Sequence, residues 1–338
     1  MLIPLEDELP RQNGYLIMIT IFTPTYNRAD LLRNLAQSLA TQTSHSFEWL
    51  VIDDGSTDET IEWLKEYSLS SSFQIRFYAQ SNQGKHVAYN AAIDSAAGEF
   101  FVCVDSDDVL TENAVKIIEQ ETKSLNDDCM GLVFPSVNKK GVPEPAWELL
   151  NGSRIDIVDL HELYGIMEEV VVFRTQRLKR HRFPVFYSTE GIPEKFCPEG
   201  VLYNELIPEG QFKAINSVIY IYEYQPNGLS HRILQLWGDN FNGTMEELHS
   251  RFAAVNKYQA LPRFFSHFKC IMNVNALCIR KRKNVLKHTP SRLLSALLFL
   301  PSVFFLFFRF NRGSVYLYRR IREKVFQGTW LRSRIERY

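Results

Sequence analysis

Apolar runs and polar clusters alternate along roughly the first 120 residues of the chain. Continuous apolar runs at 16–22, 47–52, 75–79 and 100–104 have the length and composition of strands that are buried on both faces. A segment with helical spacing of apolar or small residues follows each run. The pattern therefore predicts a βαβα series, that is, an α/β fold with a mostly parallel, doubly wound sheet.

Beyond this series the pattern becomes less regular. Further strands are predicted at 131–137, 170–173 and 211–222. Within the series, Ser56 and Glu59 have the spacing of a capping box, which predicts a helix that starts at the serine.

Polar clusters follow three of the predicted strands, at 25–28, 53–54 and 105–108. Pro24 precedes the first cluster, and because proline has no N–H to donate to a sheet, we expect the first strand to end before it. In doubly wound sheets, ligands bind beyond the carboxyl ends of the strands. Each cluster alone could be a solvated loop, but three at one edge of one sheet predict a ligand site.

The third cluster crowds carboxylates together. Asp105, Asp107 and Asp108 lie within four residues, and burying them without compensation would be costly. A divalent cation would relieve this, because Asp105 and Asp107 can offer oxygen ligands to Mg²⁺ or Mn²⁺. A polar loop that caps the next helix explains so short a pattern as well, but the other two clusters favour the metal. Asp108 either orients the loop or caps the helix.

Charge is distributed unevenly along the 338 residues, although the net charge is only −1. Residues 280–338 hold 15 Lys or Arg and only two acids, Glu323 and Glu336. The five cysteines include no Cys-x-x-Cys pair, and no basic flank precedes an apolar run at the N-terminus. These features predict reduced thiols and a cytoplasmic protein with a basic tail.

The basic segment contains an apolar run at 293–308, interrupted by Pro301. Its 16 residues are fewer than the roughly 20 that a spanning helix needs. We expect a helix that lies in the membrane interface, on the anionic inner face, with further basic residues after it. A buried core helix or a dimer contact is the alternative. No base-reading motif accompanies the charge, so no nucleic acid is expected as a partner. The basic residues that continue this edge are Arg309, Arg312, Arg319 and Arg320.

Four motifs occur in order between about residues 16 and 120. They are Thr-Pro-Thr-Tyr-Asn-Arg at 23–28, Asp-Asp-Gly-Ser-Thr-Asp at 53–58, Asn-Gln-Gly-Lys-His-Val-Ala-Tyr-Asn-Ala-Ala at 82–92 and Asp-Ser-Asp-Asp at 105–108. Each is weak singly, but their order and spacing together resemble family 2 glycosyltransferases with the GT-A fold. The resemblance implies an inverting hexosyl- or N-acetylhexosaminyltransferase that uses a nucleotide-diphosphate sugar with Mn²⁺ or Mg²⁺.

The resemblance also implies roles for donor-binding residues. Thr23, Pro24, Thr25 and Tyr26 would hold the base and ribose through backbone groups and the tyrosine ring. Asp53 would accept a hydrogen bond from the base, which favours a uracil-type imide and hence a UDP-sugar.

Further residues have implied roles at the base pocket and around the phosphates. Asp54 would either steer the base pocket or only cap the helix. Asp107 would ligate the metal, whereas Asp105 would touch the ribose or a water on the metal rather than act as an equal ligand. Lys85 or His86 would add positive charge near the phosphates.

An inverting transfer also needs a carboxylate that takes the proton of the acceptor hydroxyl. Cys-Pro-Glu-Gly-Val-Leu at 197–202 resembles the helix start where the family has this base, although Pro198 fills a slot that more often holds an acid. Glu199 is therefore the first candidate and Glu194 the second. The remaining acids nearby are interpreted as solvated: Glu190, Glu205 and Glu209.

A later loop resembles one in bacterial polysaccharide-making members of the family. Its His231 or Arg232 could reach the diphosphate or complete the metal shell. Three regions are predicted: a nucleotide-sugar-binding half at 1–135, an acceptor-binding half at 136–279 and a membrane-associating tail at 280–338.

The predicted function is transfer to a glycan or lipid-linked oligosaccharide acceptor in cell-surface polysaccharide synthesis, at the inner face of the membrane. The alternative is a catalytically silent nucleotide-sugar-binding scaffold of the same pathway. A nucleotidyltransferase would want a glycine-rich loop after the first strand, and residues 23–28 contain no glycine.

Overall fold

The chain divides into two units, Met1–His231 and Arg232–Tyr338, and each is described by itself. The predicted functional boundaries at residues 135 and 279 stay a prediction. The structure is a computed structural model, and it describes residues 3–4, 18–139, 141–188, 190–223, 232–257 and 260–309.

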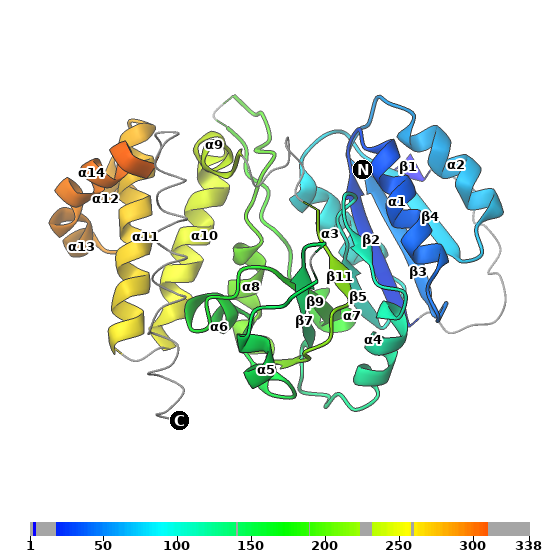
Figure 1. Ribbon diagram of the computed structural model, residues 1–338. Coiled ribbons are helices and arrows are strands. Elements are labelled where there is room, and N and C mark those ends of the chain that lie inside the picture. The colour runs from blue at the N-terminus through cyan, green and yellow to red at the C-terminus, as the bar shows by residue number, and fades with distance from the viewer. Residues whose placement is uncertain are drawn as a thin grey trace. The chain divides into compact units, whose positions relative to one another are not determined.

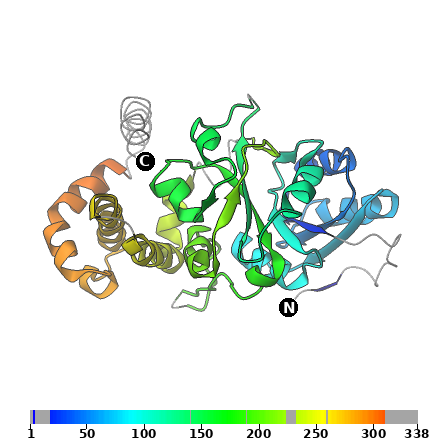
Figure 2. The ribbon, with the colours of Figure 1, turned by 90° about the horizontal axis from the view of Figure 1, so that it is seen from below.

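The N-terminal unit is built on a mixed sheet with helices on both faces (Figures 1 and 2). Strands β2 (Ile19–Thr25), β3 (Phe47–Asp53), β4 (Gln74–Ala79) and β5 (Phe100–Cys103) pair in parallel in the order β4-β3-β2-β5. A helix follows each strand or the loop after it, which confirms the predicted α/β series. These helices are α1 (Ala29–Ala40), α2 (Thr60–Ser70), α3 (Lys85–Ser95) and α4 (Ala114–Thr122).

Antiparallel pairing extends this sheet. Strand β9 (Glu169–Arg174) runs antiparallel between β5 and β7 (Gly131–Val137), and β10 (Phe212–Ala214) pairs in parallel with β7. The short strands β8 (Arg154–Ile155) and β1 (Ile3–Pro4) lie at the two ends of the strand order.

The predicted strand at 211–222 is wrong as a single element. It is divided into β10 and β11 (Tyr220–Ile221), and β11 pairs with β6 (Val109–Leu110) and with the end of β7. This places Tyr220 close to the residues that follow β5.

The expected end of the first strand before Pro24 is also wrong. Strand β2 runs to Thr25 and stays in register with β3, where Pro24 lies opposite Ile52. On its other side, β2 pairs with β5 only as far as Phe22 and Cys103. The proline therefore stands beyond the last pair with β5, where its missing N–H costs no ladder bond.

The core forms two layers, one on each face of the sheet. On one face, Trp49 and Phe100 pack with residues of α1, α2 and α4. On the other, Phe22 and Phe101 pack with α3, α5 (Ala146–Leu150), α6 (Ile157–Glu162) and α8 (Gly200–Leu206). Both faces are thus dry, as the continuous apolar runs predict, and only the strand ends are left for polar chemistry.

The C-terminal unit is helical over the residues that are described (Figure 1). Its longest helix, α11 (Ala260–Arg280), contacts α10 and α14 most extensively. No helix in the described ranges is long and apolar enough to cross a membrane. The tail residues Arg312, Arg319 and Arg320 lie outside those ranges. The other helices are α9 (Ile233–Asp239), α10 (Phe241–Ala254), α12 (Val285–His288), α13 (Arg292–Leu297) and α14 (Phe299–Arg309).

Candidate active site

The three polar clusters meet at the carboxyl edge of the parallel strands, as their positions after β2, β3 and β5 require. Around them the chain makes several loops that are fixed by buried side chains. The clusters differ in how much of each side chain is left for a ligand.

Asp53 fixes the loop after β3. Its carboxylate accepts hydrogen bonds from the amides of Gly55 (3.1 Å) and Ser56 (2.9 Å) and from the serine hydroxyl. Burial raises the pKa of this carboxyl, although those donors act in the opposite direction. The predicted capping box is wrong, because Ser56 is engaged here and α2 begins at Thr60, whose amide donates to Asp58 (3.1 Å).

Asp54 fixes a second loop, the one that leads into α3. It accepts hydrogen bonds from the Gln80 side chain (2.8 Å) and from the amides of Gln83 (2.9 Å) and Gly84 (2.8 Å). Gly84 has a φ of +97°, and a Cβ there would lie 2.1 Å from the carbonyl oxygen of Lys195. The glycine thus lets the 183–199 segment approach the start of α3.

The end of β2 offers mainly backbone and one ring. The Thr23 hydroxyl is buried and accepts a hydrogen bond from the Trp49 indole (3.0 Å). The buried Thr25 hydroxyl has no hydrogen-bond partner among the described residues. Tyr26 is 46% exposed. Thr23 could therefore contact a bound nucleotide sugar only through its main chain, whereas the ring of Tyr26 is accessible.

Lys85 links the donor-side cluster to the predicted base. Its ammonium lies 2.8 Å from Asp105 Oδ1 and 2.8 Å from Glu199 Oε1, at the first residue of α3. Burial lowers the pKa of this lysine, but the two carboxylates outweigh it and hold the pKa well above its ordinary value. Residues 85, 105 and 199 thus form one charged junction, which sequence spacing alone did not require.

Glu199 and Glu194 differ in position. Glu199 directly precedes α8, and its second oxygen accepts a hydrogen bond from Tyr203 (3.4 Å). Glu194 lies in the preceding loop, where its amide donates to the carbonyl of Phe186 (2.9 Å). Glu199 contacts Lys85 directly, which ties it to the charged junction.

Arg28, the last residue of the first motif, is a site residue for which the sequence predicted no individual role. Its guanidinium lies 2.9 Å from Asp107 Oδ1 and donates to the Ser106 hydroxyl (3.2 Å). Burial raises the pKa of Asp107, and the arginine charge acts against that rise. The final residue of the first motif thus compensates the predicted metal ligand.

Asp108 orients a loop rather than capping a helix. It accepts hydrogen bonds from the Tyr220 hydroxyl (2.6 Å) and the Glu223 amide (2.9 Å). The Tyr220 oxygen also accepts a hydrogen bond from the amide of Asp105 (3.1 Å). Burial, together with the neighbouring charge of Asp105, raises the pKa of Asp108 to about 7.

Three other candidates for contacts with the phosphates remain: His86, His231 and Arg232. His86 is buried, its Nδ1 has no partner in the described part of the chain, and burial lowers its pKa to about 4. Of the pair considered for charge near the phosphates, only Lys85 is therefore cationic at neutral pH. His231 lies outside the described residues, and Arg232 directly precedes α9.

The sequence comparison agrees with this geometry. Residues 20–180 match the Glycosyl transferase family 2 model. Residues 20–180 are a family 2 glycosyltransferase domain. They include the strand-end clusters and Lys85, whereas Glu199 lies beyond the matched range.

Two curated relatives match longer or equivalent parts of the chain. Chondroitin synthase of Escherichia coli is 26% identical over 253 residues, which cover 72% of this chain and 34% of that protein. The poly(ribitol-phosphate) beta-N-acetylglucosaminyltransferase TarS of Staphylococcus aureus is 26% identical over 166 residues, which cover 48% and 29%. The chain thus spans about a third of the length of these relatives.

Solved structures show the predicted GT-A fold. S. aureus TarS 1–349 in complex with UDP has a TM-score of 0.51 at 19% identity, over 82% of this chain and 76% of that one. The mannosyltransferase PcManGT from Pyrobaculum calidifontis, in complex with GDP-Man and Mn²⁺, has a TM-score of 0.50 at 18% identity, over 93% and 88%.

The carboxylate oxygens at this site are suitable ligands for a hard divalent cation. Asp107 and Asp105 supply carboxylates, and Mg²⁺ or Mn²⁺ is commonly held by one or two carboxylates together with substrate phosphates. Within the described ranges, no three His, Cys, Asp or Glu side chains form a group that could hold a metal by themselves. The residues therefore fit a cation that binds together with a diphosphate.

Proposed function

We propose that this protein is an inverting glycosyltransferase that moves a sugar from a UDP-sugar to a glycan or lipid-linked oligosaccharide in cell-surface polysaccharide synthesis. The single observation that supports it most is the contact of Lys85 with both Asp105 and Glu199. It links a carboxylate of the donor motif to a carboxylate that could serve as the base.

In this proposal, Glu199 accepts the proton of the acceptor hydroxyl while the oxygen attacks the sugar carbon opposite the leaving diphosphate. Its side chain is 45% exposed, so an acceptor can reach it. Lys85 holds this carboxylate in place through their direct contact. Tyr26 and the main chain of 23–25 would contact the nucleoside, with Asp53 and Asp54 keeping their loops in shape.

Asp107, with Asp105 beside it, would hold Mn²⁺ or Mg²⁺. The cation would neutralise charge on the departing diphosphate. Arg28 would then remain next to Asp107 as a second positive group facing the phosphates.

Names of similar proteins support the substrate class. One relative is a chondroitin synthase, another an N-acetylglucosaminyltransferase, and the solved TarS structure contains UDP. A peripheral position on the cytoplasmic face of the membrane, beside a lipid-linked acceptor, belongs to the same proposal, because residues 280–338 are strongly basic.

Release of UDP from a panel of UDP-sugars, with and without Mn²⁺, tests the proposal against a silent scaffold. We expect metal-dependent release with a glycan acceptor, which Asp107→Ala abolishes. Asp127→Ala, at a fully exposed acid, is the matched control and should behave as wild type. Tight metal-dependent binding of UDP-sugars without release on any acceptor would support the scaffold instead.

A further inference from the structure

Helices α13 and α14 of the C-terminal unit turn their small polar residues inward. Ser295 and Ser302 are 1% and 0% exposed. The Ser302 hydroxyl lies 3.3 Å from Met272 Sδ of α11, and the Asn275 side chain of α11 donates to the carbonyl of Ser295 (3.0 Å). The side of these helices that packs on α11 is therefore partly polar.

Large apolar residues face the other way. Leu293, Leu297 and Leu300 are 72%, 67% and 78% exposed, and Val303 is 42% exposed. A helix on the surface of a water-soluble domain has the reverse arrangement, with its apolar stripe toward the core. We call this exposed set the outer face of α13–α14, and large apolar residues exposed together on neighbouring helices indicate an interaction site.

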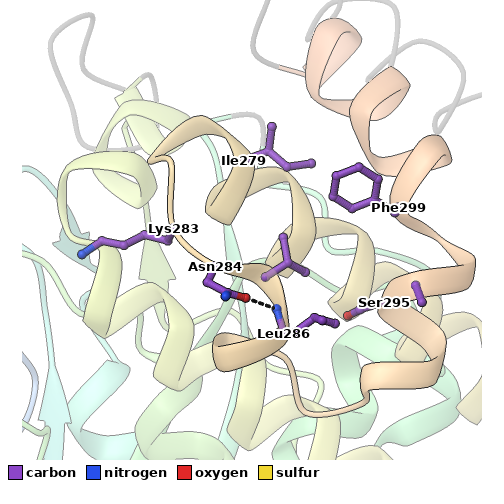
Figure 3. Close-up of a pocket in the computed structure, with 8 residues that line it drawn as sticks. Ile279, Lys283, Asn284, Leu286, Ser295 and Phe299 are labelled. Carbon is purple, nitrogen blue, oxygen red and sulfur yellow. Dashed lines mark hydrogen bonds between the residues drawn. The ribbon is translucent and has the colours of Figure 1, made fainter.

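An apolar recess is lined in part by Ala296 of α13 and Phe299 of α14, the helices that carry the outer face (Figure 3). It has a volume of about 580 Å³, and Ile279, Leu286 and Phe299 are among its lining residues. In Figure 3 the Lys283 side chain extends away from these residues, and its ammonium lies 5.7 Å from the Phe241 ring centroid. The lining of the recess is mainly hydrocarbon, although Lys283, Asn284 and Ser295 also belong to it.

The charge of the segment that carries the outer face has one sign. Residues 260–309 contain nine Lys or Arg and no Asp or Glu. Lys287 and Arg292 are exposed directly before the outer face begins. Basic side chains that border an apolar surface match an anionic lipid bilayer, whose headgroups attract the charge while its acyl region accepts the apolar residues.

We propose that the outer face of α13–α14 inserts into the acyl boundary of an anionic bilayer, with an acyl chain entering the adjacent recess. Helix α14 has 11 residues and a length of about 16 Å, roughly half the thickness of the hydrocarbon core. It lies in the interface rather than across it. This extends the peripheral location in the proposed function to a defined surface, and its test does not depend on sugar transfer.

Binding of the full chain to phosphatidylglycerol–phosphatidylcholine vesicles tests the inference. The double variant Leu297→Ser, Leu300→Ser should bind at least tenfold more weakly than wild type, because two exposed leucines lose their burial in lipid. Leu69→Ser is the matched control, since Leu69 of α2 is 80% exposed and lies in the other unit. Equal binding of the double variant and wild type would overturn the proposal, even if salt abolishes binding of both.

Insertion itself can be measured with a tryptophan placed on the outer face. Leu300→Trp should add fluorescence that brominated lipid quenches, whereas Leu69→Trp should not. A second copy of the chain is the other possible occupant. A dimer in light scattering that the Leu297, Leu300 double variant separates, with no vesicle binding by wild type, would contradict the membrane assignment.

Discussion

Two charged clusters lie at opposite edges of the parallel part of the sheet. At the amino end, Glu48 of β3 is fully buried. It accepts hydrogen bonds from the Thr20 hydroxyl (2.6 Å), the Ala97 amide (2.9 Å) and the Arg76 guanidinium (2.8 Å). All of these donors come from the protein, and no surface of the carboxylate is left for a ligand.

The carboxyl-end cluster is more open. The side chains of Lys85, Asp105 and Glu199 are 27%, 37% and 45% exposed. The one ammonium contacts both carboxylates, yet a substrate can reach each carboxylate. The comparison teaches that exposure at a strand end, rather than charge, separates an acid available for chemistry from one that stabilises the fold.

The largest expected loss of stability comes from breaking the buried cluster. Glu48→Gln removes the charge that compensates Arg76 and should lower the free energy of unfolding by about 3 kcal/mol. Denaturant unfolding measures this. Glu99→Gln breaks an exposed contact with Arg174 and should cost less than about 1 kcal/mol. Similar losses for both variants would remove the distinction between the two clusters.

Lys85→Met should affect catalysis rather than folding. It leaves Asp105 and Glu199 unbridged, and we expect kcat/KM for UDP-sugar to fall by about 100-fold. Steady-state kinetics with a thermal melt would separate the two effects. Lys139→Met removes an exposed ion pair with Glu223 and serves as control. If the melting temperature falls far enough to explain the whole loss of activity, Lys85 stabilises the fold rather than supporting catalysis.

His86 predicts a pH dependence of stability. Its pKa is about 4 in the folded protein and ordinarily 6.5, so the unfolded chain binds the proton more tightly. The stability that this group contributes is complete above pH 6.5, and about 3 kcal/mol of it is lost as the pH falls to 4. His86→Gln should flatten the curve in that window, whereas the exposed His45→Gln should not. An unchanged slope in His86→Gln would contradict the burial effect.

The smallest effect concerns the approach of the 183–199 segment to α3. Gly84→Ala should cost about 1 kcal/mol more than Gly152→Ala. Both glycines have positive φ, but only a Cβ at 84 meets backbone, whereas one at Gly152 meets no atom within 4 Å. Chemical denaturation measures the free energy of unfolding of both variants. Equal losses would show that the backbone at Lys195 moves away from the added Cβ at little cost.

Much of this architecture was predictable from the sequence. Apolar runs identify β2 to β5, β7 and β9, because strands buried on both faces need continuous hydrocarbon. The strand-end clusters follow from the parallel order. Thus the fold and the edge that holds the site were available from local pattern.

Contacts between distant residues were not predictable in this way. Arg28 meets Asp107, and Tyr220 meets Asp108, across 79 and 112 residues. The role of Ser56 was mistaken because its hydroxyl serves Asp53 rather than the helix. Such contacts depend on which residues the folded chain brings close together. The spacing of residues within a motif does not reveal those partners.

The most direct test of the link between donor site and base compares binding with transfer in Glu199→Gln. UDP affinity is measured by calorimetry and sugar transfer by UDP release, on the same preparation with Mn²⁺. We predict an affinity within about twofold of wild type and transfer reduced by about 1,000-fold, because general-base catalysis is lost. Transfer at the wild-type rate would contradict the account.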